Sequence, residues 1–540
     1  MVKRALFLLL GTCSAFAQSD RGTITGRVLD PTAAAVPDAK VEALSQSTRV
    51  RYTAQSNQTG VYSIQQLPVG RYDVTVEAPG FTRYLHKDVD ISIAQTVTLD
   101  ISLSVGAVDQ TVEVSSAPAA VESSTSDLGT VVNRNLVIDL PLSVSGNMRN
   151  PESFIFLAPG VTGDAGNTQI NGSQSRAKEV LLDGIGSTSP ESGGILFTYP
   201  SVEAIAEFKL VSSNFSAEYG RTGGGFEVFT TKSGTNDLHG TLFDYLRNNV
   251  FDARGFFAST TPVNRQNEYG FALGGPVFIP RLYNGSNKTF FHVVYSGFRF
   301  RQGATNQLTS IPPEAFRQGD FSSLVDRAGN QVPIYDPMTT RPDGAGGFLR
   351  DPFPGNVIPS SRISSVSQKI AALYPATINN SPFNNFLTVG AKRFDRDQVD
   401  VKIDHSFSDR NRLSAFVYIG TQTTHAPELL PLPLSPSKDE DYRSRWVRLT
   451  DDHIFSPTVL NHLAVGFTRE GQYWADLSAN QGWPEKLGLQ GVQSGAGDAF
   501  PIVTFSNGYN VLGGGDITTL TTPNQKSVGS QVNNVWQITD

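Results

Sequence analysis

The sequence holds 540 residues, of which 17% are charged and 10% aromatic, and its formal net charge is -7. That length exceeds one ordinary globular domain, so it predicts several cores or one large barrel. A net negative charge without a basic run gives no general attraction to nucleic acid, and we expect no nucleic-acid partner. The 50 glycines and 33 phenylalanines suit turns and short strands, so the predicted fold class is mainly β.

The first residues have the features of an export signal. Lys3 and Arg4 precede a short apolar run, and Ala15 and Ala17 supply small residues at a cleavage site. This pattern is typical of a secretory signal peptide, so residues 1–17 are predicted to be removed after Ala17. The apolar run is far shorter than the about 20 residues that a membrane-spanning helix needs.

Cys13 is the only cysteine of the chain. Because it lies within the predicted signal peptide, the mature protein is expected to form neither a disulfide nor a cysteine metal site. A lipoprotein signal ending at Cys13 is the alternative, although Thr12 fits poorly where a smaller residue is expected. No later stretch is continuously apolar, so the sequence argues against a helical membrane protein.

Residues 20–104 are predicted to form a small β-sandwich. Short strands follow one another with turn residues between them, and turns are expected at 57–60 and 68–70. Apolar residues occupy every second position, which gives each strand one buried face. The positions concerned are Ile24, Gly26, Val28, Tyr72, Val74, Val76, Val97, Leu99, Ile101 and Leu103.

Glycine and aromatic motifs of this segment keep the order found in a known family. They lie at 26–30, 37–39, 60–62, 67–72 and 78–81. In that order they resemble the carboxypeptidase regulatory-like domain, which implies a transthyretin-like sandwich. Another small Ig-like sandwich is the alternative fold for this segment. A zinc peptidase is a third functional hypothesis, but none of the seven histidines falls in a spacing that would ligate zinc beside a glutamate. We expect no catalytic residue, no metal site and no cofactor.

Residues 105–125 are predicted to be an extended linker, since Ser, Ala, Val and Glu dominate without helical periodicity. It contains Asp109, Thr111, Val112, Glu113 and Val114. These residues resemble the TonB box, by which TonB-dependent receptors are engaged from the periplasm, and they imply a TonB-type energy-coupling protein as partner. A final strand of the preceding sandwich is the alternative. The position favours the box, because a plug-like segment follows.

Residues 126–236 are rich in glycine and mix short apolar strands with polar loops, which predicts a compact α+β domain. The motifs resemble the plug domain of TonB-dependent receptors. In this chain the resemblance implies a strand that ends in an Asp-Gly turn, a further strand over 202–210, and a glycine-rich segment that leads into the barrel. The residues of this plug signature are Asn171, Gly172, Asp183, Gly184, Tyr219, Gly220 and Arg221.

Two other interpretations of the plug segment have less support. The glycines between 220 and 225 could form a phosphate-binding loop, but no Gly-Lys-Ser/Thr ending follows and the next residues are strand-like. Asp183 could be a catalytic acid. An Asp-Gly pair after a strand is usually a turn, however, and no Gly-x-Ser-x-Gly motif accompanies it.

Residues 237–540 are predicted to be the N-terminal, incomplete part of a transmembrane β-barrel. One strand alternates apolar Val399, Val401 and Ile403 with charged Asp400, Lys402 and Asp404. This alternation directs apolar groups to lipid and charges to the lumen. Short hairpin turns are expected at 408–411 and 455–458, and 303–385 is expected to be a long extracellular loop without strand periodicity.

About eight strands are expected after the plug, whereas barrels that hold a plug have around 22. The sequence therefore predicts a wall that cannot close, and a truncated or fragmentary chain. Alternation alone also fits a soluble sandwich, so a secreted or surface adhesion protein made of β-sandwiches is the second functional hypothesis. Extraction from the outer membrane with detergent distinguishes the two.

The order of signal peptide, sandwich, box, plug and barrel resembles the Oar-like subgroup of TonB-dependent receptors. The resemblance implies a Gram-negative outer-membrane protein, in contact with outer-membrane lipid, that transports an unknown bulky ligand and is not an enzyme. It leaves import and export open. The plug ending lacks the alanine-rich form of the SusC-like glycan importers, so a glycan ligand is not favoured.

Overall fold

The computed structural model describes most of the chain, and the signal peptide, Asp109 and Arg221 lie outside the described residues. The described residues are 20–106, 111–114, 127–133, 136–137, 147–164, 167–189, 193, 198–215, 219–220, 222–256, 260–303, 307–326, 328–388, 390–426, 428, 430–434, 438–456, 459–491, 498–501 and 528–540. Among them, no helix has the length and apolar character needed to cross a membrane.

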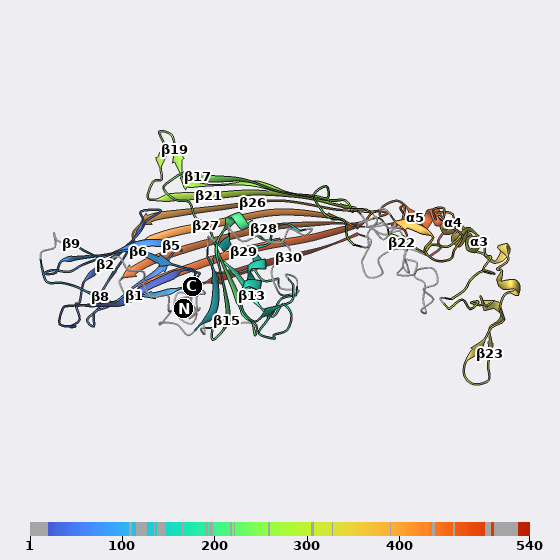
Figure 1. The fold of residues 1–540 in the computed structure, drawn as a ribbon, viewed down its shortest axis with the longest axis horizontal. Coiled ribbons are helices and arrows are strands. Elements are labelled where there is room, and N and C mark those ends of the chain that lie inside the picture. Colours follow the sequence, from blue (N-terminus) through green and yellow to red (C-terminus); the bar gives the residue numbers. More distant parts are fainter. Residues whose placement is uncertain are drawn as a thin grey trace, which may run out of the picture.

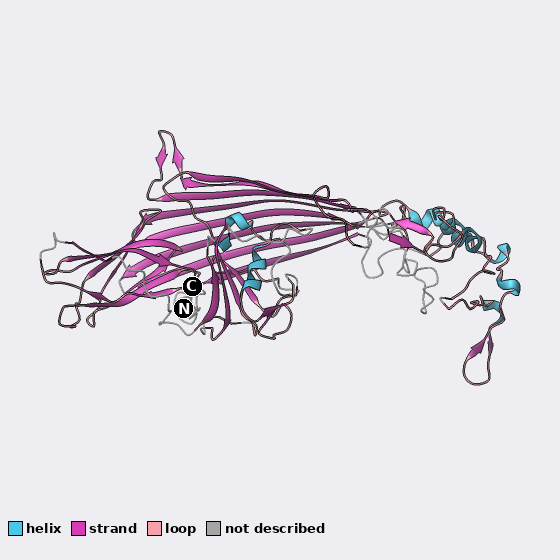
Figure 2. Cartoon of the chain, viewed as in Figure 1, coloured by secondary structure: helices cyan, strands magenta, loops and turns pink. Residues whose placement is uncertain are grey.

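Three bodies of β-structure lie along the long axis of the molecule (Figure 1). A sandwich lies at one end, a smaller sheet lies beside the middle of a wall of long strands, and the loops of that wall gather at the other end (Figure 1). Strands make up most of all three bodies, and helices are short (Figure 2). This agrees with the predicted, mainly β fold class.

The sandwich consists of two sheets, as the alternating pattern predicts. One sheet has the order β4-β1-β7, with β8 also paired to β1, and the other has the order β3-β2-β5-β6-β9. The strands of the first sheet are β1 (Gly22–Leu29), β4 (Val61–Leu67), β7 (Thr96–Thr98) and β8 (Ile101–Ser102). Those of the second are β2 (Lys40–Ser45), β3 (Arg51–Gln55), β5 (Gly70–Glu77), β6 (Arg83–Ile91) and β9 (Thr111–Val114).

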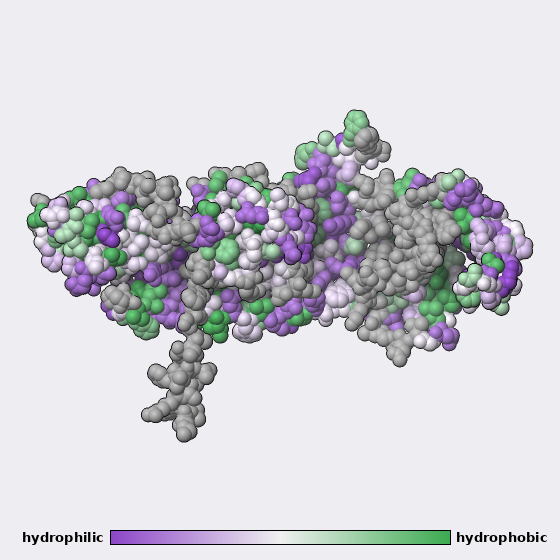
Figure 3. All heavy atoms as spheres, turned by 90° about the horizontal axis from the view of Figure 1, so that it is seen from below, coloured by the Kyte–Doolittle hydropathy of each residue, from purple (hydrophilic) through white to green (hydrophobic). Residues whose placement is uncertain are grey.

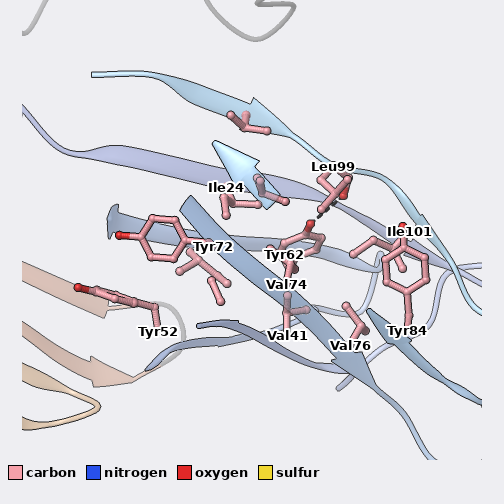
Figure 4. Packing of buried hydrophobic residues seen from close by; sticks show 14 of the residues in the cluster. Ile24, Val41, Tyr52, Tyr62, Tyr72, Val74, Val76, Tyr84, Leu99 and Ile101 are labelled. Atoms are coloured by element: carbon pink, nitrogen blue, oxygen red, sulfur yellow. Dashed lines mark hydrogen bonds between the residues drawn. The ribbon is translucent and has the colours of Figure 1, made fainter. Parts of the chain in front are cut away.

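The core of the sandwich is apolar and closely packed (Figure 4). Ile24, Val74 and Ile101 are fully buried, which confirms the predicted inward face of their strands. Tyr62 is buried too, and its hydroxyl donates to the backbone oxygen of Leu99 at 2.7 Å, so its polar atom is satisfied inside the core. Viewed from below, the surface of this end mixes hydrophilic and hydrophobic residues (Figure 3).

Residues 126–236, the predicted plug, contain a five-stranded sheet of order β10-β15-β16-β13-β14. Its strands are β10 (Leu128–Val132), β13 (Glu179–Leu182), β14 (Ile185–Gly186), β15 (Ile205–Ser213) and β16 (Phe226–Thr231), with the small pair β11 (Val161–Thr162) and β12 (Gln169–Ile170) beside it. The helical parts in the described plug residues are the 3-10 helices η1 (Pro151–Leu157) and η2 (Val202–Ala204), besides a brief turn at 136–137.

The strand predicted over 202–210 begins later than expected. Residues 202–204 form η2, and β15 starts at Ile205. The reason is local, because the Ser201 hydroxyl accepts a hydrogen bond from the backbone nitrogen of Glu203 and so caps a helical turn.

The wall is one antiparallel sheet of eight strands in sequence order, as predicted. Its strands are β17 (His239–Asn248), β18 (Asn264–Pro276), β21 (Thr289–Gly303), β26 (Ala391–Ser408), β27 (Asn411–His425), β28 (Lys438–Ser456), β29 (Val459–Asp476) and β30 (Val528–Thr539). The predicted turn at 408–411 joins β26 to β27. The turn predicted at 455–458 falls between β28 and β29, and its residues 457–458 lie outside the described residues. A small hairpin of β19 (Phe278–Ile279) and β20 (Tyr283–Asn284) joins β18 to β21.

Short turns and long loops lie at opposite ends of the wall. The turns after β26 and β28 lie at the sandwich end, whereas the connections after β21, β27 and β29 lie at the other (Figure 1). Outer-membrane barrels have this asymmetry, with short periplasmic turns and longer extracellular loops. The sandwich lies at the short-turn end, which the predicted barrel would direct to the periplasm.

The long loop between β21 and β26 is not structureless. It contains the paired strands β22 (Gln307–Thr309) with β25 (Phe386–Thr388) and β23 (Arg341–Pro342) with β24 (Phe348–Leu349). Its helices are α3 (Glu314–Arg317), η3 (Pro337–Thr339), η4 (Pro354–Asn356), η5 (Ser360–Arg362) and α4 (Ser365–Ala371), and α5 (Trp483–Leu487) comes from the loop after β29. Apolar residues of three loops, among them Ile311, Leu430 and Leu487, pack into one cluster.

Candidate functional site

The Asp183-Gly184 turn of the plug points at the barrel wall. Both residues have positive φ, 47° and 74°, as the tight hairpin between β13 and β14 requires. The Asp183 carboxylate accepts hydrogen bonds from the backbone nitrogen of Thr231 at 2.9 Å and from its hydroxyl at 2.6 Å. The predicted turn is confirmed, and its carboxylate also ties two plug strands together.

Lys402 of β26 meets this turn from the wall. Its ammonium lies 3.4 Å from the Asp183 carboxylate and donates to the Thr231 hydroxyl at 2.9 Å. Burial opposes ionisation of Asp183, but the nearby Lys402 ammonium and the Thr231 hydrogen bonds prevail and keep the pKa of Asp183 below its ordinary value. Asp183, predicted in the plug, and Lys402, predicted to face the lumen, are therefore in contact with each other.

The other described residues of the plug signature shape the plug itself. Asn171 and Gly172 adopt positive φ after β12, and the Asn171 amide donates to the backbone oxygen of Ser212 at 3.1 Å. Tyr219 is buried against Phe226, with 4.8 Å between ring centroids. Gly220 is exposed, with open space around it.

A second contact between plug and wall was not predicted. The Arg149 guanidinium of the plug donates to the Glu268 carboxylate of β18 at 2.8 Å and lies 3.2 Å from Glu203. It also lies 3.9 Å from the ring centroid of Tyr245 on β17. The inward position of Glu268 on an alternating strand is the sequence signal that could have indicated it.

Two arginines of the wall are buried against the plug. The Arg396 guanidinium donates to the backbone oxygen of Tyr199 at 2.6 Å, and that of Arg448 donates to the Ser187 hydroxyl at 3.2 Å. Each side chain is 1% exposed. Strand alternation places both inward, and they donate to the wall as well as to the plug, Arg396 to the Tyr418 hydroxyl and Arg448 to the Thr468 hydroxyl.

Inside the plug, one lysine forms ion pairs with two carboxylates. The Lys178 ammonium donates to Glu152 and, at 2.6 Å, to Glu227, and all three side chains are buried. Burial raises the pKa of Glu227 to about 8, because one ammonium cannot neutralise two carboxylates in a desolvated site. This group belongs to the interior of the plug and not to its contact with the wall.

The sandwich is attached to the plug through the turn between β6 and β7. The backbone nitrogen of Ile93 donates to the Glu207 carboxylate at 2.9 Å, and the Lys209 ammonium donates to the backbone oxygen of Ala94 at 2.9 Å. The Ile93 side chain is buried among apolar residues of the plug. Burial raises the pKa of Glu207 to about 7.

A cavity of about 600 Å³ lies where sandwich, plug and wall meet. Its lining includes Arg21, Glu207, Lys402, Arg412 and Asp452. The Arg412 guanidinium from the turn end of β27 lies 3.9 Å from the ring centroid of Tyr52, so the sandwich also contacts the wall directly. Polar and charged groups therefore line the junction of the three bodies.

The TonB-box-like residues Thr111–Val114 form β9, the last strand of the five-stranded sandwich sheet. This is the alternative placement that the sequence left open. β9 runs parallel to β6, with Val112 opposite Tyr84, and its other side is an edge in the strand order. Glu113 forms an exposed ion pair with Lys87 at 2.6 Å, and Val112 is 42% exposed.

Two models of known families match the chain. The model of the outer membrane beta barrel domain matches residues 230–540. The chain belongs to this family. The model of the carboxypeptidase regulatory-like domain matches residues 23–104, where the sequence motifs predict that domain. Membership of the barrel family indicates an outer-membrane location and disfavours the adhesion protein.

A curated relative supports the predicted resemblance to Oar-like receptors. The TonB-dependent transporter Oar of Myxococcus xanthus is 27% identical over 289 residues, which cover 51% of this chain and 27% of the relative. The chain thus spans well under half the length of this relative.

Two solved structures are similar at lower levels of identity. The outer membrane transporter YddB from Escherichia coli is 12% identical with a TM-score of 0.41, over 65% of this chain and 40% of that one. A variant of the ferric enterobactin receptor PfeA from Pseudomonas aeruginosa is 10% identical with a TM-score of 0.37, over 76% of this chain and 45% of that one.

Proposed function

We propose that the protein is a TonB-dependent transporter, and not an enzyme, that moves a bulky ligand through a plugged β-barrel and is energised by a TonB-type periplasmic protein. One observation carries the proposal, namely that the plug sheet lies against the inner face of the wall and is held there by buried polar contacts. The contact between Asp183, Thr231 and Lys402 is the clearest of them.

Polar contacts suit a plug that must move. Each hydrogen bond between plug and wall replaces one with water, so its net contribution is only about 0.5–1.5 kcal/mol, and about 1.5–3 kcal/mol where a charged group takes part. Water that enters the lumen can satisfy the same donors and acceptors during displacement. Water forms no comparable contacts with apolar side chains, so separating an apolar interface of equal area would cost more free energy.

The energy-coupling partner is proposed to engage β9. An edge strand can accept a strand from another protein, with backbone hydrogen bonds that supply affinity. β9 lies on the sandwich at the short-turn end of the wall, which corresponds to the periplasm. Asp109, just before β9, completes the box-like segment but lies outside the described residues.

The test compares Val112→Pro with Val112→Ala in the source bacterium. Proline removes a backbone donor and fixes φ, so it should abolish uptake, whereas alanine keeps the backbone intact and should be mild. Growth of a deletion strain on iron complexes, peptides and glycans first identifies the ligand. Uptake and surface binding of that ligand are then measured in parallel.

Lost uptake with preserved binding is the expected result for the proline variant. Unimpaired uptake would show that β9 is only a strand of the sandwich. Export through a cleaved signal peptide is part of the same proposal, and N-terminal sequencing of the outer-membrane protein should find Gln18 as the first residue.

A further inference from the structure

Two arginines lie directly opposite each other on the outer face of the wall. Arg445 of β28 pairs in register with Arg469 of β29, and both side chains are exposed. Side chains at such positions are about 5 Å apart at their Cβ atoms, so like charges there repel each other. Strand pairing alone does not explain why two cations occupy these positions.

Within the described part of the chain, neither guanidinium forms an ion pair. Arg469 donates to the side-chain oxygen of Asn534 on β30 at 3.2 Å, which is a neutral partner. The nearby carboxylate of Asp441 lies 3.8 Å from the Arg443 guanidinium and is thereby engaged. The two facing charges therefore remain available to an external anion.

The position of the two arginines along their strands indicates which anion they bind. One step toward the short-turn end, the outward positions are Val447, Phe467 and Trp536, and the next are Leu449, Val465 and Ile538. The Phe467 and Trp536 rings are in contact, tilted by 37° with centroids 4.3 Å apart. The arginines thus lie where the apolar surface ends, on the side of the long loops.

In an outer-membrane barrel that boundary meets the headgroups of the outer leaflet. We propose that Arg445 and Arg469 bind a phosphate group of an outer-leaflet lipid, with the acyl chains lying over Phe467 and Trp536. Guanidinium groups donate two parallel hydrogen bonds to phosphate oxygens, and two facing guanidiniums can hold one phosphate between them. The inference rests on the membrane orientation of the proposed function, but not on the ligand that is transported.

The test uses protein purified from outer membranes and native mass spectrometry, with diphosphoryl lipid A in detergent as the probe. The variant is Arg445→Gln/Arg469→Gln. Its matched control is Arg281→Gln/Arg410→Gln, which removes two exposed arginines at the short-turn end. We expect the variant to retain about tenfold less lipid A than the wild type, and the control to retain as much as the wild type.

A second variant keeps the proposal falsifiable if folding is affected. Arg445→Glu places opposite charges across the strands, so it should keep or raise the thermal stability and still lose the lipid. Dephosphorylated lipid A should bind weakly to every variant, and inorganic phosphate at millimolar concentration should not displace the bound lipid. Displacement by inorganic phosphate would show a site for free phosphate instead.

Equal retention of lipid A by wild type and both variants would overturn the proposal. Ligand uptake separates it from the proposed function, because the arginine variants should transport normally. Val112→Pro should lose uptake and retain lipid A as the wild type does, so failure of one proposal is distinguishable from failure of the other.

Discussion

The interior of the sandwich and the interface between plug and wall differ most in how much charge they bury. The sandwich core is built from apolar residues such as Ile24, Val74 and Tyr62, nearly all fully buried. The interface of plug and wall buries charges, among them Asp183 and Lys402, beside wall residues such as Phe416 and Trp446 that pack on the apolar plug core. An apolar core is stable because water cannot replace it, whereas buried polar contacts can be exchanged for water. Under the proposed function, the sandwich core is a permanent fold and the plug–wall interface is a contact that opens during transport.

The largest expected effect comes from the sandwich core. Tyr62→Ala removes a buried ring and the hydrogen bond to Leu99, so it should destabilise the sandwich by about 3–5 kcal/mol. Tyr62→Phe keeps the ring and should cost only about 1 kcal/mol. Hydrogen exchange of the backbone amides in β1 and β4 measures the loss of stability in each variant. Equal effects of the two variants would show that the hydrogen bond, and not the packing, dominates.

A smaller effect is expected at the interface. Lys402→Met leaves the Asp183 carboxylate buried without its cation, which should weaken docking of the plug by about 1–3 kcal/mol. The observable is faster hydrogen exchange at 180–186, with the sandwich unchanged. Lys392→Met, on the same strand near its loop end, is the matched control. Faster exchange throughout the chain would mean that Lys402 stabilises the wall as a whole.

The contact between sandwich and plug should depend on pH. The pKa of Glu207 rises from its ordinary 4.5 to about 7 on burial, so docking favours the protonated carboxyl. The contribution of Glu207 to docking of the sandwich on the plug is full below about pH 4.5 and is lost as the pH rises through about 7. Its largest possible loss is about 3 kcal/mol. Glu207→Gln should remove this dependence.

Hydrogen exchange around Ile93, compared between wild type and Glu207→Gln at each pH, measures the effect. Exchange of the wild type should increase relative to the variant between pH 5 and pH 8. A constant ratio would show that Glu207 does not change its protonation on docking.

The sequence predicts best what depends on local periodicity. Alternation indicated the inward faces of the sandwich strands and the inward position of Lys402, and the Asp183-Gly184 pair indicated its turn. Contacts between distant segments escaped prediction because docking geometry determines them. Arg149 and Glu268 are 119 residues apart, and the parallel pairing of β9 with β6 has no local signature. Likewise, the register of β28 and β29 places Arg445 opposite Arg469.

Displacement of the plug is the central claim, and a reversible crosslink tests it most directly. The hydroxyls of Ser201 in the plug and Ser296 on β21 lie 2.8 Å apart, and both residues are buried. Since the chain has no cysteine besides Cys13, Ser201→Cys/Ser296→Cys introduces one defined disulfide between plug and wall. We predict that the oxidised variant binds ligand at the surface but does not transport it, and that reduction restores uptake. Uptake at the wild-type rate while the crosslink is intact would contradict the account.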